Sequence, residues 1–216
     1  MSQRFARWLS RRDVTPNQIS MASVLFAVLA ACCLLGMSWI EGNADWALPV
    51  LAAFFIQCRL LCNLFDGMVA IEGGKSTPSG ELFNDIPDRI ADPIILVAAG
   101  YSTAVVPWGG SLGWAGSLGG TAALGWAAAL GAVLTAYVRT LAASIGAPMD
   151  FRGPMAKQQR MALMTFACLM TAIEPLLWER GWFLLGALAL IVLGCSITVG
   201  RRARAAYVAL EGEADA

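Results

Sequence analysis

Long apolar stretches alternate with short polar connectors along most of this chain. About 20 predominantly apolar residues in a helix are enough to cross the ~30 Å hydrocarbon layer of a bilayer. The pattern predicts six such spans, over about 17–39, 46–71, 82–105, 121–144, 157–177 and 181–199. We therefore expect an all-α, polytopic membrane protein with one domain over 1–216.

The two ends of the chain have a different pattern. Residues 1–14 place Phe5, Trp8 and Leu9 on one helical face, with arginines around them. This arrangement is typical of an amphipathic helix that lies on an anionic membrane surface. Residues 200–216 begin with a cluster of arginines and end in acids, and we expect them to form a tail whose arginines (Arg201, Arg202 and Arg204) anchor it at the membrane surface.

The basic residues predict how the spans are oriented. With six spans, nearly all Lys and Arg residues fall on one side; only Arg180 falls on the other, and Arg59 lies within a span. Basic residues are enriched in cytoplasmic loops. The sequence thus predicts a multi-pass protein of the cell (inner) membrane, with both termini and the polar segment described below facing the cytoplasm.

The composition supports this class and disfavours others. Hydrophobic residues make up 58% of the 216 residues and charged residues only 14%, against roughly 25% charged in a soluble domain. A net charge of zero argues against a nucleic-acid partner. The chain has six cysteines and no histidine, which disfavours a zinc site and a histidine-based catalytic triad. We expect the cysteines to be buried free thiols.

Residues 63–92 carry polar side chains at helical spacing within the apolar chain. Asn63 and Asp66 are three residues apart, Asn84 and Asp88 are four apart, and a glycine-rich stretch between the two pairs allows the chain to reverse. Polar groups at membrane depth are costly and are usually functional. Two facing pairs of oxygen donors predict a site for a hard cation, Mg²⁺ or Mn²⁺, with one or two ions.

The same segment resembles the signature of the CDP-alcohol phosphotransferase family, D-x2-D-G-x2-A-R-x8-G-x3-D-x3-D. The spacing matches without a gap, but asparagines occupy the first and third acid positions and isoleucine the arginine position. In order along the signature, the residues are Asn63, Asp66, Gly67, Ala70, Ile71, Gly80, Asn84 and Asp88. The string DRIAD at 88–92 is similar to the phosphatidylinositol-type members.

The resemblance implies transfer of a substituted phosphate from a CDP-linked donor, CDP-diacylglycerol, to an alcohol or phosphorylated alcohol, with release of CMP. It implies that Asp66 and Asp88 are catalytic, with Asp88 as the base that deprotonates the acceptor. The metal ligands would be Asp66, Asn63, Asn84 and Asp88. Because two acids have become amides, either a single ion binds or neighbouring acids compensate, with Asp85 and Asp92 as candidates.

The resemblance also implies two binding regions and a homodimer. Residues that match the cytidine diphosphate pocket are Asn63, Gly67, Ala70, Thr77 and Gly80, with Asn17 as a further candidate. The acceptor, or its phosphate, would be bound by Arg139, Lys157 and Arg160. Two alternatives remain open: a polar network without a metal, and a family member that binds nucleotide or lipid without turnover.

Overall fold

The computed structural model describes residues 16–37, 46–72, 80–103, 120–177 and 181–214, and within these ranges all regular structure is helical. The α-helices are α2 (Pro16–Gly36), α3 (Ala47–Glu72), α4 (Gly80–Ser102), α6 (Gly120–Ser144), α7 (Lys157–Ile173) and α8 (Trp182–Ala214), with a short 3₁₀ turn, η2 (Glu174–Leu176), after α7. Apolar segments in a bilayer become helical because a helix satisfies its own backbone hydrogen bonds. The amphipathic helix predicted for 1–14 lies outside the described residues.

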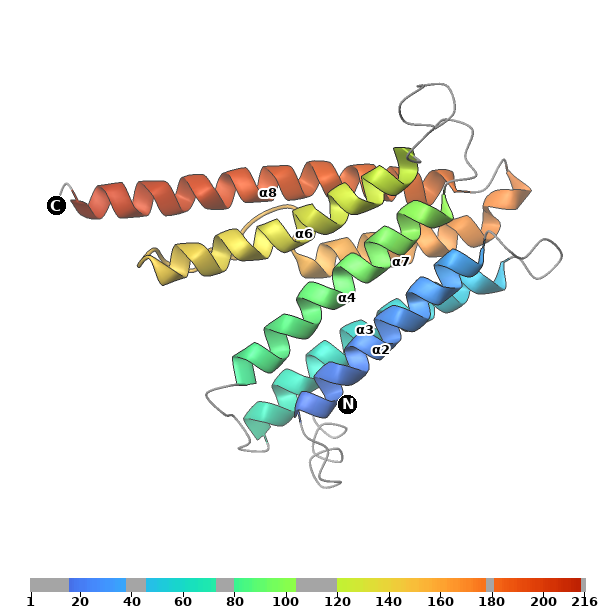
Figure 1. Ribbon diagram of the computed structural model, residues 1–216, viewed down its shortest axis with the longest axis horizontal. Helices are drawn as coiled ribbons and strands as arrows, with labels where there is room; N and C mark the ends of the chain where they lie inside the picture. The colour runs from blue at the N-terminus through green and yellow to red at the C-terminus, as the bar shows by residue number, and fades with distance from the viewer. Residues whose placement is uncertain (1–15, 38–45, 73–79, 104–119, 178–180, 215–216) are drawn as a thin grey trace.

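The helices form two groups of three, α2–α4 and α6–α8. Figure 1 shows these groups close together at one end and diverging toward the end where α2 begins and α8 ends. Helix α2 packs on α3 and α4, α4 packs on α6, α6 on α8, and α3 on α7, which joins the two groups. Polar side chains of α3, α4, α6, α7 and α8 line a cavity that is described below.

Small side chains let the helices approach closely, which is the usual way to pack helices in a membrane. Ala27, Ala30 and Ala52 are fully buried in the main core. The α4–α6 crossing is closer still: a Cβ added at Gly125 would lie 2.8 Å from the Leu96 carbonyl oxygen and 2.9 Å from the Gly100 Cα. This crossing therefore requires glycine, and it fixes α4, which carries Asp85, Asp88 and Asp92, against α6.

Four helical segments in the described part of the chain are long and apolar enough to cross a membrane: Asn17–Gly36, Ala47–Asp66, Gly120–Ser144 and Trp182–Gly212. The prediction of an all-helical membrane protein is therefore confirmed. The count of six spans is not confirmed, because α7 has only 17 residues and α4 carries several charged residues in its first half. These two helices contribute five of the seven charged residues that line the cavity described below.

The region predicted as a tail over 200–216 is helical as far as Ala214. Helix α8 has 33 residues and continues to Ala214 without interruption. Its last turns are rich in Ala, Arg, Leu and Glu, which are strong helix formers. The arginine cluster is consequently presented on a helix next to the end of α6.

Candidate functional site

A cavity of about 440 Å³ lies between the helices of the two groups and is lined mainly by polar side chains. Helix α3 contributes Asn63 to this lining. Its charged lining residues are two acids, Asp85 and Asp88, and five bases, Arg89, Arg139, Lys157, Arg160 and Arg202. The excess of bases gives the cavity a positive field, which favours an anionic ligand such as a phosphate.

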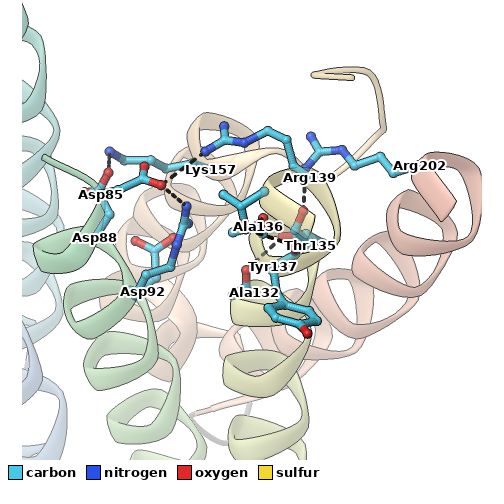
Figure 2. A network of polar contacts seen from close by, with 12 residues as sticks. Asp85, Asp88, Asp92, Ala132, Thr135, Ala136, Tyr137, Arg139, Lys157 and Arg202 are labelled. Atoms are coloured by element: carbon cyan, nitrogen blue, oxygen red, sulfur yellow. Dashed lines mark hydrogen bonds and ion pairs between the residues drawn. The ribbon is translucent and has the colours of Figure 1, made fainter. Parts of the chain in front are cut away.

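Asp88 lies on the cavity and is paired with two cations. Its side chain is almost buried, and the Nη2 of Arg59 donates to its Oδ1 at 3.0 Å. The Nζ of Lys157 donates to its Oδ2, and Figure 2 shows Lys157 reaching from α7 toward Asp88 on α4. Helices α3 and α7 therefore hold the Asp88 carboxylate from two sides.

Asp92, one turn after Asp88 on α4, is also bound by two cations. The Arg59 Nη2 lies 2.6 Å from its Oδ1, and the Arg160 Nη2 donates to its Oδ2 at 2.9 Å. Arg160 also donates to the Thr135 hydroxyl at 3.2 Å and to the Met155 carbonyl at 3.0 Å. This network joins α3, α4, α6 and α7, and its residues Thr135 and Arg160 line the cavity.

Asp85 occupies the more exposed side of the cavity. The Nη2 atoms of Arg89 and Arg139 lie 2.8 Å and 3.5 Å from its Oδ2, and 45% of its side chain is exposed. The Arg139 guanidinium also stacks on the Phe151 ring, 5.1 Å from its centroid. Figure 2 shows Arg139 extending from α6 toward Asp85. Asp85 and Asp92 are thus both paired with arginines.

Asp66 and Asn63 lie near the end of α3 in two different environments. Asp66 is buried, and the Ser20 hydroxyl of α2 donates to its Oδ2 at 2.8 Å. Asn63 lines the cavity, whereas Asp66 does not. The Nδ2 of Asn63 is buried and has no acceptor among the residues whose side chains are described. The first polar pair of the motif therefore extends from the cavity into the contact between α2 and α3.

The structure brings six of the predicted site residues to this one cavity: Asn63, Asp85, Asp88, Arg139, Lys157 and Arg160. Asn17 lies in the first turn of α2. Gly67, Ala70, Gly80 and Asn84 lie on helices α3 and α4, but their side-chain surroundings are outside the described part, as is Thr77 entirely.

Two arginines have roles that the sequence analysis did not assign. Arg59 is fully buried and binds both Asp88 and Asp92; a charge within an apolar span was the signal that could have identified it. Arg202, expected to be a surface anchor, is buried instead and donates to backbone carbonyls of Thr135, Phe151 and Arg152 at 2.6, 3.2 and 3.1 Å.

Arg202 therefore holds the loop between α6 and α7 against α8. In the same loop, Arg152 donates from its backbone nitrogen and its Nε to Asp150 Oδ1, at 2.8 and 3.0 Å. These hydrogen bonds lower the pKa of Asp150. Arginines thus hold this loop at residues 150–152, next to Phe151 of the cavity lining.

The donor atoms decide how many divalent ions the residues could hold. Both oxygens of Asp88 and both oxygens of Asp92 are next to a protein cation, and no three Asp, Glu, His or Cys residues in the described part gather as a metal site. Asp66, with the amide of Asn63, remains as a pair of hard oxygen donors. Within the described part of the chain, Asp66 and Asn63 are therefore the donors that fit a divalent ion.

Comparison with known proteins gives one sequence relative and a shared fold. No protein-family model matches the chain. The inner membrane protein YnbA of Escherichia coli (strain K12) is 24% identical over 191 residues, which cover 86% of this chain and 82% of that protein. Together with the apolar helices, this likeness is consistent with an inner membrane protein.

The structural neighbours are crystal structures of Mycobacterium tuberculosis phosphatidylinositol phosphate synthase PgsA1. The complex with manganese and citrate superimposes with a TM-score of 0.76 at 17% identity, covering 96% of this chain and 89% of that one. The complex with CDP-DAG has the same TM-score at 18% identity, covering 96% and 94%. At this identity the comparison shows that the two proteins share a fold.

Proposed function

We propose that this chain is a membrane CDP-alcohol phosphotransferase that transfers a phosphatidyl group from CDP-diacylglycerol to an alcohol and releases CMP. One observation carries the proposal: Asn63 and Asp88, from the two halves of the signature spacing, line the same basic cavity. The fold is that of an enzyme crystallised with CDP-DAG and, separately, with manganese. That enzyme belongs to the family whose signature residues 63–92 resemble.

The reaction assigns a distinct task to Asp88. The acceptor hydroxyl attacks the phosphorus that carries the diacylglycerol, the bond from that phosphorus to the bridging oxygen breaks, and CMP leaves with this oxygen. Asp88 accepts the hydroxyl proton, because it is the most buried acid that lines the cavity. Lys157 and Arg59 position its carboxylate.

The basic side of the cavity is the proposed acceptor region. Arg139, Lys157 and Arg160 come from α6 and α7 and face the cavity opposite Asp88's helix. Guanidinium and ammonium groups bind phosphate through charge-assisted hydrogen bonds. A phosphorylated alcohol is therefore the acceptor class that this lining favours.

The donor side is proposed at the ends of α3 and α4. Asp66, with the amide oxygens of Asn63 and Asn84, would hold one Mg²⁺ or Mn²⁺, which would supply Lewis-acid neutralisation of the pyrophosphate. Gly67, Ala70, Thr77 and Gly80 would border the cytidine diphosphate, with Asn17 nearby. We further propose that both termini and the cavity face the cytoplasm and that the protein is a homodimer.

A second candidate is a protein of this fold that binds a CDP-linked lipid without turnover. Three features favour it: amides at two acid positions, Ile71 in place of the arginine, and an Asp88 carboxylate with both oxygens already paired. Such a protein would bind CDP-diacylglycerol saturably but release no CMP.

The test is CMP release from CDP-diacylglycerol by purified protein with Mg²⁺ and a panel of acceptors: glycerol phosphate, serine, inositol and inositol phosphate. Asp88→Asn should lower the rate by about 10²–10⁴-fold, the range for loss of a general base. Asp150→Asn is the matched control, since Asp150 lies outside this cavity. Saturable donor binding with no CMP from any acceptor would favour the binding protein.

A further inference from the structure

Arg59 is a permanent positive charge that lies next to two acids of segment 63–92. It lies four residues before Asn63 on the same face of α3, and none of its surface is exposed. A buried charge in a membrane span is costly unless it is paired. Arg59 meets this requirement through two carboxylates of α4, Asp88 at 3.0 Å and Asp92 at 2.6 Å.

The charges around Arg59 differ from those of a site built on four acids. With amides at positions 63 and 84, only Asp66 and Asp88 of the four signature positions are negative. Asp85 and Asp92 do not restore a metal-binding cluster, because arginines bind them. The two amides and the buried Arg59 guanidinium change the charge balance in the same direction, toward fewer metal ions.

The geometry of Arg59 reproduces what a bridging ion does. A single nitrogen, Nη2, contacts one oxygen of Asp88 and one of Asp92, so one cation joins two carboxylates on successive turns of α4. The other oxygens of these acids are bound by Lys157 and Arg160. Arg59 Nε and Nη1 are buried with no acceptor among the described side chains.

We infer that Arg59 is an internal cation that takes the place of one metal ion and that the protein, rather than a metal, holds Asp88. The inference deepens the proposed function and rests on it. Arg59 is a positioning residue, because it lies outside the cavity lining and acts through Asp88. The chain then binds at most one divalent ion, at Asp66, and Asp88 is not a metal ligand.

The experiment is a Mn²⁺ titration of the purified full-length protein in detergent, followed by the electron paramagnetic resonance signal of free Mn²⁺. We expect no more than one Mn²⁺ per chain, weakened at least tenfold in Asp66→Asn and changed less than about twofold in Asp88→Asn. Arg59→Gln frees oxygens of Asp88 and Asp92, so we expect it to bind a second Mn²⁺. Arg59→Lys retains a cation and should not.

Arg152→Gln is the matched control, because it also frees a carboxylate from an arginine, but neither Arg152 nor Asp150 lines the cavity. It should leave the Mn²⁺ stoichiometry unchanged. Two Mn²⁺ per wild-type chain, or at least tenfold weaker binding in Asp88→Asn, would overturn the inference. Both measurements remain decisive even where Arg59→Gln does not fold.

CMP release, measured on the same preparations, separates this inference from the proposed function. A wild-type protein that releases CMP and binds two Mn²⁺ overturns the internal cation and leaves the function standing. A protein that binds one Mn²⁺, gains a second in Arg59→Gln and releases no CMP supports the internal cation and overturns the transferase.

Discussion

Replacing Asp92 with asparagine removes one negative charge that two buried guanidinium groups share. The side chains of Asp92 and Arg160 are each 4% exposed, and that of Arg59 is fully buried. Removing one partner of a buried ion pair costs about 3–5 kcal/mol. Arg59 keeps Asp88 as a partner, so we expect the loss to lie near the lower end of that range, about 3 kcal/mol.

Thermal unfolding of the purified protein in detergent, followed by the fluorescence of its eight tryptophans, measures this loss. For a chain of this size, each kcal/mol lowers the Tm by about 2–4 °C, which gives Asp92→Asn a decrease of roughly 6–12 °C. Asp85→Asn makes the same chemical change in a side chain that is 45% exposed. An exposed pair contributes about 0–1 kcal/mol, so this control should lose less than about 4 °C.

The difference in Tm between the two variants tests whether the buried ion pairs stabilise the protein. Melting temperatures for Asp92→Asn and Asp85→Asn within about 2 °C of each other would show that the buried network does not stabilise the four helices.

Three further predictions follow from individual contacts. Lys157→Met removes a cation from the proposed acceptor region, and the KM for a phosphorylated acceptor should rise about 10–100-fold, the equivalent of one charge-assisted hydrogen bond; an equal effect on unphosphorylated acceptors would contradict the assignment. Arg202→Met loses three hydrogen bonds to carbonyls and should destabilise the protein by about 2–4 kcal/mol, with faster proteolysis between α6 and α7; unchanged melting and cleavage would refute it. Gly125→Ala overpacks the α4–α6 crossing and should cost about 1–3 kcal/mol in thermal unfolding, whereas Gly186→Ala, with no atom within 4 Å of the added Cβ, should not; equal melting of the two would show that the crossing can relax.

The helices could be predicted from the sequence, and so could the presence of Asn63 and Asp88 at one site. Apolar length predicted where the described helices lie. Helical spacing with a chain reversal predicted that the pairs Asn63/Asp66 and Asn84/Asp88 would meet. Asn63 and Asp88 line one cavity, whereas Asp66 does not line it and the side chain of Asn84 is outside the described part. Arg139, Lys157 and Arg160, which the resemblance assigned to the acceptor, line the same cavity. The spacing of residues within one helix allows these predictions, because it fixes which side chains share a face.

The ion pairs between helices could not be predicted in the same way. Whether Arg59 faces Asp88, Asp92 or lipid depends on how far α3 is rotated relative to α4 and α7, and spacing within one helix does not fix that rotation. Arg202 was expected to be a surface anchor for the same reason, because its partners are carbonyls of α6 and a loop. The apolar pattern also predicted that α4 and α7 would be membrane spans. Helix α4 carries several charged residues and α7 has only 17 residues, and ion pairs between helices compensate their charges.

The most direct test of the account is whether purified protein converts CDP-diacylglycerol and an acceptor into CMP and a new phospholipid, with both products quantified by mass spectrometry. We predict that the wild-type chain forms CMP and the phospholipid in equal amounts, and that it forms most with a phosphorylated alcohol as acceptor. Asp88→Asn should form at least about 100-fold less of both. Intact donor after incubation with every acceptor, or product formation that is the same in Asp88→Asn, would contradict it.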